Sequence, residues 1–189
     1  MNRRILGVLT LVAVVLIVVS SILYFRMHAH GPVQSASQAP VAGKAQINKA
    51  APQFEVDTTA GLFDLSKTAK PVFLEVFATW CPHCQHETPI VDKLFATYRS
   101  RVDFVAVSGS DTAMDGTSPS SENDVVNWIR RFNVRYPVAY DPILNVANLY
   151  LQGGFPTFAI IDSKKKIRYL EDGEVSYAEL DAALRAVLR

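Results

Sequence analysis

The sequence is poor in cysteine and in net charge. Only two cysteines occur among its 189 residues, and both belong to one Cys-x-x-Cys pair. Without a second such pair, neither a structural zinc site nor a framework of structural disulfides is indicated. The formal net charge of +1 gives no sign of a nucleic acid or a strongly acidic partner. No internal repeat is apparent, so a repeat architecture is not indicated either.

The one long hydrophobic run lies near the N-terminus. Residues 5–25 carry no charge, and a helix of that length is about 30 Å long, enough to cross the hydrocarbon core of a bilayer. Because Arg3 and Arg4 precede the run and only Arg26 follows it closely, residues 1–4 are predicted to be cytoplasmic. A cleaved signal peptide is the alternative, although its apolar region is usually only about 7–15 residues long. Both interpretations deliver the rest of the chain to a compartment where disulfides persist.

The composition changes after this run. Residues 26–50 lack apolar periodicity and are rich in Ala, Gln, Ser, Pro and Gly, which predicts a flexible linker. A folded domain is expected over residues 51–189. It opens with Ala51-Pro52-Gln53-Phe54 and continues into a β-hairpin that includes residues 61–65.

The two cysteines lie in the stretch Trp80-Cys81-Pro82-His83-Cys84, between an apolar run at 72–77 and an amphipathic pattern at 85–98. This order predicts a buried strand, then cysteines on the first turn of a helix. The helix dipole and the free N–H groups there favour a thiolate at Cys81. One attacking thiolate and one resolving thiol are what thiol-disulfide exchange requires.

The remaining pattern alternates between strands and helices, which indicates an α/β domain. Capping boxes at residues 121–124 and 176–179 mark the starts of two helices. Residues 108–123 are polar and contain glycine and proline, so a long loop is expected there. Strands are predicted at 72–77, 101–108, 157–161 and 167–171, helices at 85–98, 125–132, 143–151 and 177–188, and a short extended piece at 136–141.

Trp-Cys-x-x-Cys after a buried strand resembles the active site of the thioredoxin superfamily. Three further features are similar to that family: Pro89, five residues after Cys84; Glu75, six residues before Cys81; and the stretch Phe155-Pro156-Thr157, which resembles a cis-proline loop. Together with the apolar N-terminal run, the pattern resembles membrane-anchored TlpA/ResA-like proteins, the group that includes DsbE/CcmG. The resemblance implies a thioredoxin fold from about residue 50 onwards, with an N-terminal β-hairpin and a central helical insertion.

The resemblance also implies roles for individual residues. Cys81 is the expected nucleophile and Cys84 the resolving thiol, and together they form the redox-active disulfide. Glu75 is expected to be buried and to exchange a proton with Cys84; the alternative is a glutamate that points into solvent from a strand end. Phe155, Pro156 and Thr157 are expected to bind an extended substrate segment opposite Cys81.

The residues around the cysteines are expected to tune the site. Trp80 would shield it and present an apolar contact, with plain core packing as the alternative. Pro82 and His83 lie between the cysteines, and His83 is expected to stabilise the Cys81 thiolate and make the disulfide more oxidising. His86 and Glu87 are expected to be exposed helix residues.

These expectations describe a membrane-tethered, extracytoplasmic protein-disulfide oxidoreductase that needs no cofactor and no metal. By resemblance it reduces cysteine-containing protein substrates, in a process such as cytochrome c maturation, and receives electrons from a membrane donor of DsbD/CcdA type. The domain would lie in the periplasm or another extracytoplasmic space, held by a single-pass anchor in the cytoplasmic membrane. The string Cys-Pro-His-Cys also resembles that of DsbA, so a disulfide-donating oxidase is the alternative.

Two other interpretations are weighed against this one. A copper-binding or copper-delivery protein on a thioredoxin fold would use Cys81 and Cys84 with His83 or His86 as ligands. No histidine follows His86 in the chain. A peroxiredoxin is suggested by residues 51–54, but its isolated peroxidatic cysteine is replaced here by a Cys-x-x-Cys pair.

Overall fold

The computed structural model describes residue 20 and residues 44–189. The predicted N-terminus at 1–4, the anchor at 5–25 apart from Ser20, and residues 26–43 of the predicted linker lie outside the described residues. Among the residues that are described, no helix has both the length and the apolar character needed to span a membrane.

A seven-stranded mixed sheet forms the centre of the described domain, with strand order β2-β1-β5-β4-β3-β6-β7. Strand β3 pairs in parallel with β4, which pairs in parallel with β5; the other neighbours are antiparallel. The strands are β1 (Glu55–Thr58), β2 (Gly61–Asp64), β3 (Val72–Phe77), β4 (Asp103–Ser108), β5 (Val138–Tyr140), β6 (Thr157–Ile161) and β7 (Ile167–Asp172). The predicted α/β class and the N-terminal hairpin, β1–β2, are confirmed.

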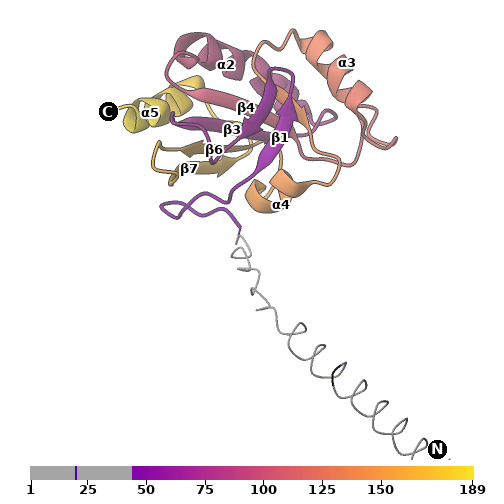
Figure 1. The fold of residues 1–189 in the computed structure, drawn as a ribbon. Helices are drawn as coiled ribbons and strands as arrows, with labels where there is room; N and C mark the ends of the chain where they lie inside the picture. The colour runs from indigo at the N-terminus through magenta and orange to yellow at the C-terminus, as the bar shows by residue number, and fades with distance from the viewer. Residues whose placement is uncertain (1–19, 21–43) are drawn as a thin grey trace, which may run out of the picture. The chain divides into compact units, whose positions relative to one another are not determined.

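Helices cover both faces of this sheet, as Figure 1 shows. They are α2 (Pro82–Tyr98), α3 (Glu122–Phe132), α4 (Asn145–Tyr150) and α5 (Tyr177–Val187). The apolar side chains of α2, α3 and α5 pack on one face, around Phe73 and Phe77 of β3. On the other face α4 packs with the segment before β1, around Leu74 and Val76. All six residues of β3 are buried, because both of its faces are covered.

Several predicted boundaries differ from those of the structure, and the clearest differences have a physical reason. The helix predicted at 85–98 begins at Pro82, since Cys81 is its N-cap and proline suits the first helical turn. The extended piece at 136–141 is a strand of the sheet, β5, which pairs with β4 and with β1. The following helix, α4, begins only at Asn145, because Leu144 has a left-handed conformation with φ 55°.

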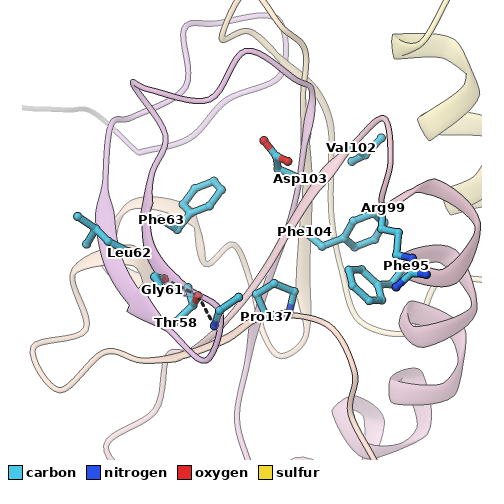
Figure 2. A pocket seen from close by; sticks show the side chains of 11 residues that line it. Thr58, Gly61, Leu62, Phe63, Phe95, Arg99, Val102, Asp103, Phe104 and Pro137 are labelled. Atoms are coloured by element: carbon cyan, nitrogen blue, oxygen red, sulfur yellow. Dashed lines mark hydrogen bonds between the residues drawn. The ribbon is translucent and has the colours of Figure 1, made fainter.

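A cavity beside the β1–β2 hairpin lies far from the cysteines. This cavity of about 370 Å³ is lined by the hairpin, by the start of β4 and by the last turns of α2, including Phe95 and Arg99; Figure 2 shows Leu62 and Phe63 of β2 across from them. Cys81 caps the opposite end of α2, and a helix of 17 residues is about 25 Å long. The cavity is therefore not part of the cysteine site.

Candidate active site

Cys81 is the N-cap residue of α2. Its backbone is extended, with φ −74° and ψ 118°, and its Sγ accepts a hydrogen bond from the backbone N–H of Cys84 at 3.4 Å. Both cysteines are free thiols. A sulfur in the N-cap position takes the place of the side-chain oxygen that usually satisfies these N–H groups. The helix terminus therefore stabilises negative charge on the Cys81 sulfur.

Cys84 lies one turn further along α2 and is even less exposed than Cys81, although both cysteines are buried. Its side chain is fully buried, whereas Cys81 keeps 4% of its surface exposed. Burial raises the pKa of the Cys84 thiol well above its ordinary value, and the carboxylate of Glu75 raises it further. The structure thus pairs a helix-capping sulfur with a fully buried thiol that holds its proton.

The loop before β6 comes next to Cys81 although it is distant in sequence. The Phe155–Pro156 peptide bond is cis. The Cys81 S–H donates a hydrogen bond to the Phe155 carbonyl oxygen, with the sulfur and the oxygen 3.5 Å apart. Thr157, the first residue of β6, donates its hydroxyl to the Gly154 carbonyl at 2.9 Å. The cis-proline loop that leads into β6 therefore meets the Cys81 sulfur through the Phe155 carbonyl.

Trp80 lies at the rim of the site. Its side chain is 38% exposed, so the alternative of a plain core residue is wrong. The indole Nε1–H donates to the Ser110 Oγ at 2.8 Å, and the ring meets that of Phe155 edge-on with centroids 6.0 Å apart. Trp80 thus joins the loop after β4 to the cis-proline loop.

Glu75 is buried inside the domain. Residues alternate between the two faces of a strand, so Glu75 shares with Phe73 and Phe77 the face of β3 that α2 covers. The residue is only 1% exposed, and neither carboxylate oxygen has a hydrogen-bond partner within the described residues. Burial raises its pKa to about 8, the charge of Glu87 adds to the rise, and the Tyr136 hydroxyl opposes it. The alternative of a solvent-pointing Glu75 is wrong.

Glu87 is buried, so the expectation of an exposed helix residue is wrong. Its side chain is 1% exposed; one carboxylate oxygen accepts the backbone N–H of Val175 at 3.0 Å, and the other has no partner within the described part of the chain. Burial raises the pKa of Glu87. The signal in the sequence is its spacing: Glu87 follows Cys84 by three residues, and positions three apart share one helix face.

The two histidines of α2 are exposed and share one partner. Nδ1 of His83 lies 2.7 Å from Oε1 of Glu174, and Nδ1 of His86 lies 3.3 Å from the same oxygen. Both histidines lower the pKa of Glu174, with His83 contributing most. No hydrogen bond joins His83 to the Cys81 sulfur among the residues described.

A metal site gains no support from this arrangement. Within residues 44–189, no group of three or more His, Cys, Asp or Glu side chains is disposed to hold a metal ion.

Comparison with known proteins agrees with this geometry. The redoxin family model matches residues 46–184. A thiol-disulfide oxidoreductase ResA of Bacillus cereus is 30% identical over 149 residues, which are 76% of this chain and 80% of that protein. The chain belongs to the redoxin family, as a TlpA/ResA-like thiol-disulfide oxidoreductase.

Other members of this TlpA/ResA-like group give the same result. ResA of Oceanobacillus iheyensis is 32% identical over 151 residues, or 75% of this chain and 73% of that protein. The crystal structure of a Chlorobium tepidum protein assigned as the thiol:disulfide interchange protein DsbE has a TM-score of 0.67 and 25% identity. The match covers 77% of this chain and 100% of the Chlorobium tepidum chain. The predicted thioredoxin-like fold is therefore confirmed.

Proposed function

We propose that the chain is a membrane-tethered, extracytoplasmic oxidoreductase that reduces disulfides in partner proteins through Cys81 and Cys84. The observation that carries this proposal is the contrast between the two sulfurs. Cys81 caps a helix, where negative charge is stabilised, while Cys84 is fully buried with a raised thiol pKa. Such a pair attacks with one sulfur and resolves with the other.

The chemistry balances with the two cysteines alone. The Cys81 thiolate attacks one sulfur of the partner's disulfide, forms a mixed disulfide and releases the partner's other sulfur as a thiolate. Cys84 then loses its proton and attacks the Cys81 sulfur, which leaves the chain as a disulfide and releases the partner's second sulfur as a thiolate. The two released thiolates take up the proton that Cys84 lost and one proton from solvent, so the partner leaves as a dithiol. Glu75 accepts the Cys84 proton, because its carboxylate is buried close enough to influence that thiol.

The placement of the protein in the cell is part of the same proposal. Residues 1–4 are cytoplasmic, 5–25 form the anchor, 26–50 the linker and 51–189 the domain in the periplasm or an equivalent space. A DsbD/CcdA-type membrane protein returns the chain to the dithiol state. The substrates are extracytoplasmic proteins with a cysteine pair, and cytochrome c maturation is the process to test first.

A trapping experiment tests the proposal. In the Cys84→Ser variant the mixed disulfide on Cys81 persists, and mass spectrometry of the captured species identifies the partner. The Cys81→Ser variant is the matched control and captures nothing. Equal capture by both variants would contradict the assigned roles.

The reduction potential tests the direction of electron flow. A value for the Cys81–Cys84 couple near that of thioredoxin, about −270 mV, supports the reductase; a value near about −120 mV supports the DsbA-like alternative.

A further inference from the structure

The carboxylate of Glu174, outside the Cys-x-x-Cys motif, contacts His83, one of the two residues between the cysteines. Glu174 lies in the loop between β7 and α5, and its Oε1 meets Nδ1 of His83 at 2.7 Å and Nδ1 of His86 at 3.3 Å. The two histidines are one turn apart on α2, and the sequence alone predicts no common partner for them.

The loop that carries Glu174 is fixed to α2 by a second contact. The next residue, Val175, is buried and donates its backbone N–H to Glu87 of α2 at 3.0 Å. Two adjacent residues of the loop therefore bind the same helix, one at its surface and one at its buried face. This anchorage places the Glu174 carboxylate against the first turns of α2, where it meets His83 and His86.

The contact matters because of what an imidazole does beside a thiolate. A protonated or hydrogen-bond-donating histidine stabilises the thiolate, and a stabilised thiolate makes the disulfide more oxidising. In this structure Nδ1 of His83 is engaged by Glu174, and the carboxylate balances the charge of a protonated ring. The charged groups that act on this carboxylate are His83 and His86, while Glu174 and His86 in turn act on Glu87.

We propose that Glu174 is a positioning residue for the exchange reaction: it holds the His83 and His86 rings away from the Cys81 sulfur. The Cys81–Cys84 couple is thereby more reducing than a Cys-Pro-His-Cys motif with a free histidine would be. This inference rests on the proposed function and explains how an oxidase-like motif serves a reductase.

The test compares the full-length chain with its Glu174→Gln variant at equilibrium with glutathione. In this reaction two glutathione thiols reduce the Cys81–Cys84 disulfide, giving one glutathione disulfide and the protein dithiol. We expect the variant to favour the dithiol by a factor of about three to ten, which corresponds to a potential about 15–30 mV higher. When the thiolate absorbance of Cys81 is followed against pH, the midpoint of its appearance should lie at a lower pH in the variant than in the wild type.

Two further variants separate positioning from a simple charge effect. In a His83→Gln/His86→Gln background, Glu174→Gln should change the equilibrium constant less than about twofold, because the rings through which Glu174 acts are gone. Glu171→Gln removes an exposed carboxylate from β7 that contacts neither histidine, and should leave the wild-type constant unchanged.

The inference is overturned if Glu174→Gln leaves the constant at its wild-type value, or if its effect persists in full without the histidines. A wild-type chain that does not exchange with glutathione at all gives a different result, since it overturns the proposed function itself.

Discussion

Glu75 and Glu87 are two carboxylates from different elements, buried on the same side of the sheet, and the charge of Glu87 raises the pKa of Glu75. Glu75 comes from β3 and Glu87 from the helix that packs over it. Two negative charges in this setting repel each other and lack solvation, so the pair favours a state in which one carboxyl holds a proton. In the proposed mechanism the ionised form of Glu75 takes up the proton that Cys84 loses, and the protonated carboxyl can then return a proton to the cleaved sulfur of a partner.

The raised pKa of Glu75 predicts a pH-dependent stability. Unfolded Glu75 loses its proton near pH 4.5, whereas the folded carboxyl holds it until about pH 8. Between these values folding takes up a proton, so the contribution of Glu75 to the unfolding free energy is full below pH 4.5 and falls as the pH rises, by at most about 1.4 kcal/mol per pH unit.

Urea denaturation of the reduced chain and of Glu75→Gln, at intervals between about pH 5 and 8, measures this contribution. The variant should gain in stability relative to the wild type as the pH rises, because glutamine has no proton to lose. Glu171→Gln, at an exposed residue of β7, should follow the wild type throughout. A constant difference between Glu75→Gln and the wild type would contradict a pKa near 8.

Removal of the same carboxylate should slow the second step of catalysis. With Glu75→Gln, the attack of Cys84 on the mixed disulfide loses its proton acceptor, and a fall of about 100-fold in the single-turnover rate is expected. Alkylation of Cys81 by iodoacetamide should stay within about twofold of wild type, because that reaction needs no proton from Cys84. Slowing of both reactions by the same factor would indicate a structural role instead.

The sequence predicts the fold of this domain well because its signals are local. The apolar run at 72–77 is strand β3 with every residue buried, and the capping box at 121–124 starts α3 with Ser121 accepting the N–H of Asp124. The predicted position of the cysteines on the first turn of a helix is confirmed, with Cys81 as the N-cap of α2, although the amphipathic pattern that starts at Gln85 misses the first three residues of that helix.

The contacts made across the fold are harder to predict. The pairing of Glu174 with His83 joins positions 91 apart in the chain, and no local pattern marks it. Glutamate is rarely buried, which is why the sequence favours an exposed Glu87. Its burial depends on the Val175 N–H, which the loop after β7 supplies.

Close packing around Gly109 predicts that a larger side chain at this position destabilises the domain. A methyl group at Gly109 would lie 2.6 Å from Cγ1 of Val76 and 2.8 Å from Cβ of Ala147, and both neighbours are rigid. Gly109→Ala should lower the unfolding free energy by about 1–3 kcal/mol, measured by urea denaturation. In a Val76→Ala background the same substitution should cost less, since the nearest methyl group is gone. Equal costs in both backgrounds would show that the clash is relieved elsewhere.

The hydrogen bond from Trp80 to Ser110 predicts a pair of substitutions with one shared effect. Trp80→Phe keeps an aromatic ring against Phe155 but loses the indole N–H, and Ser110→Ala removes the acceptor of the same bond. A single hydrogen bond contributes about 0.5–1.5 kcal/mol, so each variant should lower kcat/KM for a disulfide-bonded protein substrate by about two- to tenfold. Ser110→Ala also removes the bond that the Ser110 Oγ accepts from the Thr112 N–H, so the double variant should be no slower than the slower of the two single variants. Multiplied losses in the double variant would mean that Trp80 and Ser110 act independently, and the loop after β4 would then not be positioned through this bond.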